Sequence, residues 1–497
     1  MCLDIHFTFA GICCMIYLAI LRIQGVFGLK SSGLLGSGNI KKVHMTGIGG
    51  ISMSGLAEIL AYNGYIVTGS DERPSPVLQK LEKSGIRVTV GHFAENVAGA
   101  DLLVYTAAVR PDNIELVAAS GAGIPCIDRA TLLGEIMDHY PMSFAVSGTH
   151  GKTTTTSMIS MIMLEEGLDP TVHIGGMLPA IGGSTRIGSS GIFVTEACEY
   201  AGSFLKFYPR VAVILNIDYD HVDCFRDIDD VKHAFRSFSE HVPQNGHIVL
   251  NGDDETAVEA LGGISCDITT FGMKDDRYTW SASGIEFDDM GCASYTLLRL
   301  GEPVAEIKLK VPGLHNVSNS LAAIAACDLA GCSISSAAKA LLKFTGTCRR
   351  FEIKGVSDGV TVVDDYAHHP SEITASLKAA AGYNHSRIWC VFQPHTYSRT
   401  KSLMDDFSKS FDNADFVILT DIYAARETDT GEVNSSMLAE KIALSGKTAV
   451  YIKDFESIVE LLDKNVKSGD LVITMGAGDV YKVGDMFLEA RKKLAVS

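Results

Sequence analysis

The sequence predicts an α/β protein built from three domains. From Lys42 onward, short apolar strands alternate with longer amphipathic stretches, the pattern of βαβ units around mostly parallel sheets. The chain has 497 residues, and at roughly 150 residues per domain this length suggests about three domains. The chain divides into three blocks, and each contains a strand that ends in a glycine-rich corner. Such corners are typical of strand-to-helix turns in doubly wound domains.

The first block, residues 41–141, begins with a strand over 43–46 and a corner that includes Gly49 and Gly50. Ser52 stands where a dinucleotide fingerprint has its third glycine or alanine, and Asp71 follows the second strand at the distance of a ribose contact. A helix over 52–62 and further strands over 65–68, 88–90 and 102–105 complete a Rossmann-like domain. For the corner itself two interpretations stay open, a nucleotide or pyrophosphate site and a plain tight turn.

The second block, residues 142–345, contains the strongest motif in the chain, a loop that follows a strand over 143–146. Its residues are Gly148, Thr149, His150, Gly151, Lys152, Thr153 and Thr154. A glycine-flexed loop between a strand and a helix turns backbone N–H groups toward one point, where the helix dipole adds positive potential. Lys152 offers a cation for the β- and γ-phosphates and Thr153 a hydroxyl for Mg²⁺. The loop predicts a central P-loop ATPase domain, in a tighter form than the ordinary Walker spacing.

Two polar residues of the same block follow predicted strands and are candidate metal ligands. Glu196 ends a strand over 192–196, and His221 comes shortly after a strand over 211–216. Because Mg²⁺ prefers oxygen ligands, Glu196 is the stronger candidate. A solvated acidic turn remains the alternative for the stretch around His221. Further along, a strand over 247–251, antiparallel-looking alternation over 269–310 and a helix over 316–329 complete the block.

The third block, residues 346–497, predicts a second Rossmann-like domain with strands over 360–363, 388–392, 416–420 and 471–474. Arg350 lies at the junction of the second and third blocks, where a hinge arginine reaches a transferring phosphoryl group when domains close. A surface salt bridge is the alternative for this arginine. Ligands of open α/β sheets bind beyond the carboxyl ends of the strands, so the site is expected where the three blocks meet.

Composition excludes some classes of partner. Lysine plus arginine number 42 against 59 aspartate plus glutamate, a net charge of −17, so we expect no nucleic acid held by a broad basic surface. The 12 cysteines form no CxxC pair, which favours free thiols in a reducing cytoplasm.

Residues 1–40 comprise an apolar segment and a linker. The segment over 5–21 carries no formal charge and is at the lower edge of the length that spans a bilayer. Three interpretations stay open: an extension upstream of the true start, a membrane anchor, and a helix packed on the globular part. Membrane contact is expected only if the segment is an anchor.

Together these stretches resemble the Mur ligase superfamily, and more narrowly its alanine-adding branch. The resemblance runs from about Lys42 to the carboxyl end. It is carried by the ordered segments 44–55, 147–156, 196–199, 216–223, 313–319, 349–352, 364–370 and 392–400. One departure concerns the metal strand, where many relatives have an aspartate at the position of Cys198.

The resemblance implies an ATP- and Mg²⁺-dependent enzyme that joins L-alanine to the lactyl carboxylate of UDP-N-acetylmuramate through an acyl phosphate. This is the first peptide-adding step of peptidoglycan precursor synthesis. It implies catalytic roles for Lys152, Arg350 and His221, and metal binding by Thr153, Glu196 and His221. His315 and Asn316 would flank the adenine, with Asp364 near the ribose. The implied substrate-binding residues are Gly49, Gly50, Ser52, Asp71, Tyr366, His368 and Arg399.

We expect a cytoplasmic protein that is a monomer or a weak homodimer. The nearest alternative is a sister ligase that adds another amino acid or a preformed peptide to the same UDP-sugar. A nucleotide-sensing protein without activity and an NAD-dependent dehydrogenase are more distant alternatives. The first would lack working metal residues, and the second leaves the loop at 148–154 unexplained.

Overall fold

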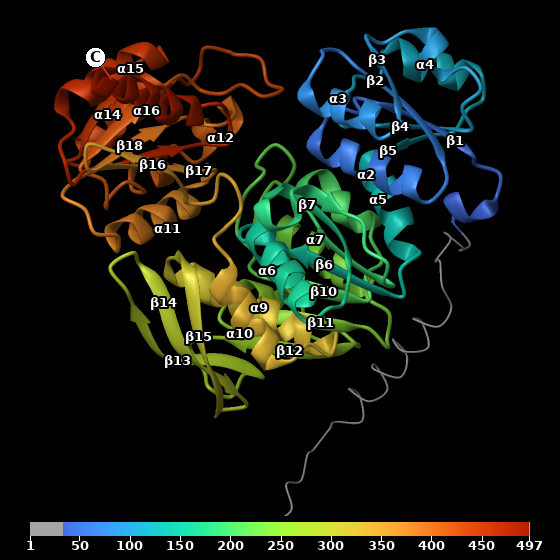
Figure 1. Ribbon diagram of the computed structural model, residues 1–497, viewed down its shortest axis with the longest axis horizontal. Coiled ribbons are helices and arrows are strands. Elements are labelled where there is room, and N and C mark those ends of the chain that lie inside the picture. The colour runs from blue at the N-terminus through green and yellow to red at the C-terminus, as the bar shows by residue number, and fades with distance from the viewer. Residues whose placement is uncertain (1–32, 497) are drawn as a thin grey trace, which may run out of the picture.

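The computed structural model describes residues 33–496, and its strands form three separate sheets. Figure 1 shows a first domain in blue and teal, a central domain from green to yellow, and a third domain from orange to red. The predicted α/β class with mostly parallel sheets is confirmed. The exact domain boundaries given above remain predictions.

The first domain has a five-stranded parallel sheet in the order β3-β2-β1-β4-β5. The strand β1 lies at its centre because its apolar residues Val43 and Met45 are fully buried between the layers. The elements are η1 (Leu35–Ser37), β1 (Lys42–Thr46), α2 (Ile51–Tyr62), β2 (Ile66–Asp71), α3 (Pro76–Lys83), β3 (Arg87–Val90), η2 (Ala94–Val97), β4 (Leu102–Tyr105), α4 (Ile114–Gly121), β5 (Cys126–Asp128) and α5 (Arg129–Asp138).

The central domain has a ten-stranded sheet in the order β15-β14-β13-β12-β11-β10-β6-β9-β7-β8. The strand β6 pairs in parallel with β10 and β9, so the phosphate loop that follows it lies at the middle of the sheet. The strands are β6 (Met142–Ser147), β7 (Thr171–Leu178), β8 (Gly183–Arg186), β9 (Ile192–Glu196), β10 (Val211–Ile214), β11 (His247–Asn251), β12 (Asp267–Gly272), β13 (Trp280–Phe287), β14 (Cys292–Arg299) and β15 (Glu302–Pro312). The antiparallel pairing of β13 with β14 and of β14 with β15 agrees with the alternation in the sequence.

Helices cover both faces of the central sheet. One core is formed with α6 (Lys152–Glu165), α9 (Leu314–Leu329) and α10 (Ile334–Lys343), and the core on the other face includes Phe235 and Phe238 of α7 (Ile228–Glu240). Figure 1 shows α6, α9 and α10 in front of the strands. The shorter elements are η3 (Pro179–Ile181), η4 (Tyr200–Lys206) and α8 (Glu255–Ala260).

The third domain has a six-stranded sheet in the order β16-β17-β21-β18-β19-β20, in which only the edge strand β16 is antiparallel. Its buried strands read as continuous apolar runs because helices cover both faces. The elements are β16 (Glu352–Ser357), β17 (Val360–Asp365), α11 (Pro370–Ala381), β18 (Ile388–Phe392), α12 (Tyr397–Ser402), α13 (Met404–Ser408), β19 (Phe416–Leu419), α14 (Ser435–Leu444), β20 (Thr448–Tyr451), α15 (Phe455–Asn465), β21 (Leu471–Met475) and α16 (Tyr481–Val496).

Part of the predicted amino-terminal linker packs on the first domain. Leu35 is 2% exposed, and its backbone carbonyl accepts a hydrogen bond from the Tyr65 hydroxyl. The apolar segment 5–21 lies outside the described residues. Among the residues from 33 to 496, no helix has the length and apolar character needed to cross a bilayer.

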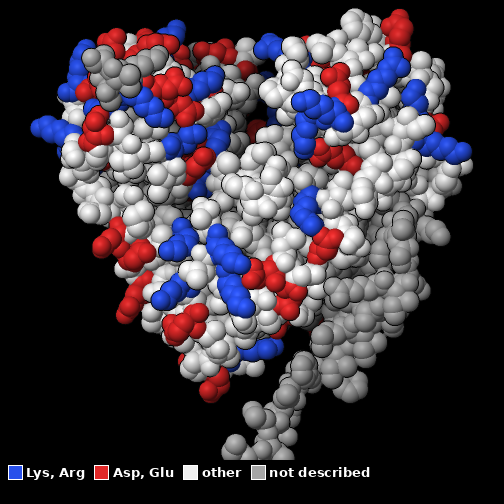
Figure 2. All heavy atoms as spheres, viewed as in Figure 1, with Lys and Arg blue, Asp and Glu red and all other residues white. Residues whose placement is uncertain are grey.

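Charged side chains of both signs are interspersed over the face drawn in Figure 2. This face carries no broad basic patch, and a hollow separates the first domain from the third.

Candidate functional site

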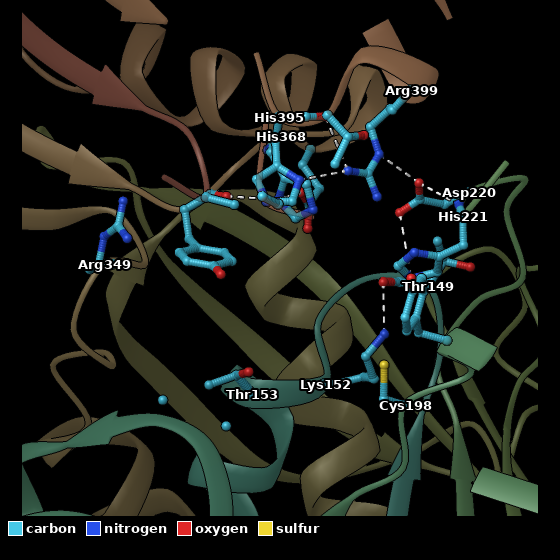
Figure 3. A pocket seen from close by; sticks show the side chains of 18 of the residues that line it. Thr149, Lys152, Thr153, Cys198, Asp220, His221, Arg349, His368, His395 and Arg399 are labelled. Atoms are coloured by element: carbon cyan, nitrogen blue, oxygen red, sulfur yellow. Dashed lines mark hydrogen bonds and ion pairs between the residues drawn. The ribbon is translucent and has the colours of Figure 1, made fainter. Parts of the chain in front are cut away.

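A cavity of about 660 Å³ is lined by residues from all three domains. Ile51 comes from the first domain, and the central domain supplies the phosphate loop and the ends of β9 and β10. The third domain contributes Arg350, Tyr366, His368 and Arg399. Figure 3 shows Lys152 and Thr153 on one side of the cavity and His368, His395 and Arg399 on the other. The cavity therefore brings together groups that lie more than 200 residues apart in the sequence.

The phosphate loop has the backbone that its glycines allow. Gly151 is the N-cap of α6 with a φ of 85°, in the left-handed region that favours glycine. A Cβ at Gly151 would lie 2.6 Å from Oδ1 of Asn319, so a side chain is excluded there on two grounds. The loop thus delivers the N-terminus of a 14-residue helix to the cavity, where backbone N–H groups and the helix dipole favour an anion.

The amine of Lys152 is held by a buried carboxylate. Its Nζ lies 2.9 Å from Oε2 of Glu199, and these side chains are 14% and 2% exposed. Burial disfavours the charge of Lys152, but the Glu199 carboxylate outweighs burial and raises the lysine pKa. Burial likewise opposes ionisation of Glu199, and the charges of Lys152 and His221 outweigh it and lower the Glu199 pKa. Nε2 of His221 lies 3.4 Å from Oε1 of Glu199.

Thr153 and Glu196 form a pair of oxygen donors beside this lysine. The Thr153 hydroxyl donates to Oε2 of Glu196 at 3.0 Å, and Oε1 of Glu196 accepts from the backbone N–H of Gly175 at 2.7 Å. Cys198, Glu199 and His221 place one ligand atom each within 4.8 Å of one another. Burial raises the pKa of the Cys198 thiol to about 11, so that thiol is protonated at neutral pH.

An ion pair joins the central and third domains at the wall of the cavity. Nε of Arg399 donates to Oδ1 of Asp220 at 2.9 Å, and both side chains are 6% exposed. Burial opposes ionisation of Asp220, but the Arg399 guanidinium outweighs burial and lowers the pKa of this carboxyl. Nη1 of Arg399 also lies 3.1 Å from Nδ1 of His395. The guanidinium thus has partners within the protein in addition to the substrate contact expected for it.

The two adjacent arginines at the domain junction have different surroundings. Arg349 donates to Asp364 at 3.0 Å and to the carbonyls of Gly476 and Gly478 at 2.7 and 3.0 Å, so its guanidinium is bonded within the third domain. Arg350 lines both this cavity and a second one, and its guanidinium forms an ion pair with Glu372 at 3.6 Å. Arg350 is therefore the arginine that is available to a ligand.

A second cavity of about 310 Å³ lies on the other side of the phosphate loop. His315 and Asn316 line it, together with His150 and Glu372. The expected ribose residue Asp364 is buried against Arg349 and Thr474 and lines neither cavity, whereas the next residue, Asp365, lines the second one. The register of β17 explains the difference, because successive side chains of a strand point to opposite faces.

The first-domain corner makes its contacts within the protein. Oδ2 of Asp71 accepts from the backbone N–H of Gly49 at 2.9 Å, and Gly50 is the N-cap of α2. The hydroxyl of Ser52 lies 2.8 Å from Nε2 of His173 in β7, which ties α2 to the central domain. Neither Ser52 nor Asp71 lines the two cavities, and their contact with the UDP-sugar stays a prediction.

Four non-glycine residues with positive φ line the large cavity. They are His221, Arg349, Thr396 and Ala425, with φ between 52° and 66°. Such backbone angles cost about 1–3 kcal/mol each and persist where the surrounding structure enforces them. Their gathering at one cavity agrees with a functional site.

Comparison with known families accounts for nearly all of the described chain. Residues 42–141 match the model of the Mur ligase family catalytic domain, residues 146–327 the Mur ligase middle domain, and residues 349–478 the Mur ligase glutamate ligase domain. The chain belongs to the Mur ligase family. The resemblance stated above is thereby confirmed, and this Mur ligase is an ATP-dependent ligase that forms amide bonds in peptidoglycan synthesis.

Individual relatives narrow the position of this Mur ligase within the family. A UDP-N-acetylmuramate–L-alanine ligase of Acetivibrio thermocellus is 58% identical over 94% of this chain and 100% of its own. The ligase of the same name from Caldanaerobacter subterraneus is 53% identical over 91% and 98%. Among solved structures, the UDP-N-acetylmuramate–alanine ligase of Thermotoga maritima is 30% identical with a TM-score of 0.76, covering 91% of this chain and 99% of that one. A murein peptide ligase of Psychrobacter arcticus is 25% identical with a TM-score of 0.69, covering 91% and 98%.

The structure also assigns partners that the sequence of this Mur ligase did not reveal. Glu199 holds Lys152, Asp220 holds Arg399, and Glu372 lies beside both Arg350 and His150. Glu199 and Asp220 lie within segments that carried the resemblance, but no spacing rule pairs them with a lysine 47 residues away or an arginine 179 residues away.

Proposed function

We propose that this Mur ligase joins L-alanine to the lactyl carboxylate of UDP-N-acetylmuramate at the expense of ATP. The identity of 58% with a UDP-N-acetylmuramate–L-alanine ligase, extending over 94% of this chain, supports the assignment most directly. The cavity supports the same chemistry, because the phosphate loop of the central domain faces arginine and histidine side chains of the third domain across one space.

The proposed reaction has two steps. The γ-phosphoryl group of ATP passes to the lactyl carboxylate, which gives an acyl phosphate and ADP. The amine of L-alanine then attacks the acyl carbon, the tetrahedral intermediate collapses, and amide and inorganic phosphate form. A free carboxylate is a poor electrophile, and phosphorylation gives it a leaving group.

Protein residues supply position and positive charge for the first step. Lys152 and the N-terminal N–H groups of α6 hold the β- and γ-phosphates, and Arg350 neutralises charge on the group in transfer. Thr153 and Glu196 suit a divalent ion, because a hydroxyl and a carboxylate oxygen 3.0 Å apart are the hard donors that Mg²⁺ prefers, and His221, which lines the same cavity, is the third proposed ligand. Bound there, Mg²⁺ would neutralise phosphate charge.

Two regions of the cavities suit the nucleoside of ATP and the incoming amino acid. We place the adenine against His315 and Asn316 in the second cavity, and the ribose near Asp365 in place of Asp364. Tyr366, His368 and Arg399 line the large cavity on the side of the third domain, where the amino acid would enter. Burial lowers the pKa of His368 to about 4, so its imidazole is neutral at physiological pH; Nδ1 donates to the carbonyl of Tyr366 at 2.9 Å, which leaves Nε2 as a hydrogen-bond acceptor for the amino acid.

The alternative is a ligase that adds a preformed peptide. The similarity to the structure of a murein peptide ligase, with a TM-score of 0.69, is the observation that supports this alternative. Phosphate release with UDP-N-acetylmuramate, ATP and each of L-alanine, L-serine, glycine and a tripeptide separates the two. We expect L-alanine to give the highest kcat/KM. Release that requires the tripeptide and ignores L-alanine would reject the proposal.

A further inference from the structure

A cluster of two histidines and a carboxylate lies at the contact between the phosphate loop and the third domain. His150 belongs to the loop, Asp218 follows β10, and His369 is the N-cap of α11. Their ligand atoms all lie within 4.8 Å of one another, with Nε2 of His150 3.4 Å and Nδ1 of His369 3.9 Å from Oδ2 of Asp218. None of the three is among the residues expected to hold Mg²⁺.

The nitrogen of each imidazole that points away from the cluster is already engaged. Nε2 of His369 donates to the backbone carbonyl of Tyr219 at 3.2 Å, so the lone pair lies on Nδ1, which accepts a hydrogen bond from the Ser371 hydroxyl at 2.6 Å and lies 3.9 Å from Oδ2 of Asp218. Nδ1 of His150 lies 3.3 Å from Oε1 of Glu372, which leaves Nε2 toward Asp218. A carbonyl or carboxylate behind a ring nitrogen is the arrangement that orients histidine ligands in metal sites.

We propose that His150, Asp218 and His369 form a binding site for a divalent transition-metal ion of the Zn²⁺ class, which bridges the phosphate loop to the third domain. Two imidazole nitrogens and one carboxylate oxygen are a donor set that suits Zn²⁺ and leaves a fourth position for water or for the nearby Ser371 hydroxyl. The side chains of Asp218 and His150 are 46% and 20% exposed, so an ion has a route from solvent.

The bridging geometry has a consequence for turnover. His150 and Asp218 belong to the central domain and His369 to the third, so an ion bound by all three ties the two domains together beside the nucleotide cavity. We expect the two domains to separate when ADP leaves the cavity between them, so Zn²⁺ at this site should slow turnover. This consequence depends on the function proposed above, whereas binding of the ion does not.

Co²⁺ absorption tests the site in the full-length protein without substrates. The other candidate metal group contains Cys198, so an ion there gives a thiolate-to-cobalt charge-transfer band, and an ion at the proposed site does not. The Cys198→Ser, His221→Ala protein lacks the thiol and the imidazole of the other candidate metal groups, and we expect it to bind one Co²⁺ that Zn²⁺ displaces. His369→Asn, which keeps an N-cap side chain for α11, should weaken this binding by about tenfold or more, and Asp218→Asn should do the same.

The control is His233→Asn, which removes an exposed histidine of α7 and should bind as the parent does. Circular dichroism in EDTA identifies any variant that fails to fold. Equal affinity in the parent, His369→Asn and Asp218→Asn proteins would overturn the proposed site, as would the absence of thiolate-free binding. In turnover assays of the otherwise unaltered enzyme, Zn²⁺ should slow phosphate release and His369→Asn should resist it. Equal inhibition of both would overturn the assignment of the effect to this site.

Discussion

Nζ of Lys152 lies 2.9 Å from the carboxylate of Glu199, and both side chains are largely buried. Lys152, which is expected to bind the ATP phosphates, is therefore also one partner of a buried ion pair. Loss of one partner from such a pair leaves an uncompensated charge and costs about 3–5 kcal/mol. The stability and the activity contributed by Lys152 can be separated by experiment for this reason.

Lys152→Met should reduce ATP turnover by about 10²–10³-fold, because the transferring phosphoryl group loses its nearest cation. The same variant should lower the free energy of unfolding by about 3 kcal/mol, because Glu199 is left unpaired. Adding Glu199→Gln should restore most of the stability and none of the turnover. Denaturant titration and phosphate release measure the two effects, and a double variant that regains turnover would refute the role of Lys152.

Arg350→Ala should lower kcat by about 10²-fold with little change in melting temperature, because its guanidinium faces both cavities. The neighbouring Arg349→Ala is the matched comparison. Arg349 bonds Asp364 and two backbone carbonyls, so its loss should lower the melting temperature by several degrees. Thermal unfolding and kinetics of both variants measure the two effects. A large loss of melting temperature in Arg350→Ala together with a large loss of kcat only in Arg349→Ala would show that the two roles are wrongly assigned.

Asp220→Asn should weaken closure of the third domain on the central one. The Asp220–Arg399 pair crosses the domain contact with both side chains 6% exposed, and breaking it costs about 3 kcal/mol. We expect small-angle scattering with ATP analogue and UDP-sugar bound to give a larger radius of gyration for Asp220→Asn than for the unaltered protein. Asp229→Asn, at an exposed position of α7, serves as control. An unchanged radius would show that this pair does not hold the domains together.

The buried imidazole of His173 should make the protein sensitive to acid. Burial and then the charge of Arg129 lower the pKa of His173 to about 3. Below pH 6.5 the His173 imidazole is protonated in the unfolded chain, whereas in the folded protein it stays neutral down to about pH 3. This contribution to stability is therefore present above pH 6.5 and is lost progressively as the pH falls.

Between pH 7 and pH 5 the loss attributable to His173 is about 2 kcal/mol. His173→Gln should therefore lose about that much less stability than the unaltered protein over the same interval. Urea titrations at the two pH values measure the difference. Equal pH dependence of the two proteins would show that His173 is not buried as a neutral imidazole.

The sequence predicted the buried central strands of the three sheets more accurately than the short strands at or near the sheet edges. Strands 102–105, 192–196, 247–251 and 388–392 were predicted with the observed bounds, because buried parallel strands give continuous apolar runs. The strands β5, β7, β8, β16 and β20 were not predicted. β5 has three residues, and β16 contains Gly355 and lies half-exposed at a sheet edge, so neither gives a clear period of two.

Some residues of the candidate site could likewise be predicted from the sequence, and others could not. The phosphate loop could be predicted because local spacing alone determines its chemistry. The carboxylate partners Glu199, Asp220 and Glu372 could not, because they are defined by contacts between distant segments. The choice between Asp364 and Asp365 depended on which face of β17 each side chain occupies, and the resemblance alone did not give that register.

The central claim is that the carboxylate of the sugar substrate is phosphorylated before the amide forms. UDP-N-acetylmuramate labelled with ¹⁸O in its lactyl carboxylate tests this claim most directly, with ATP and L-alanine in one turnover. We expect one labelled oxygen to appear in the inorganic phosphate that is released. Unlabelled phosphate, formed alongside the amide product, would contradict it.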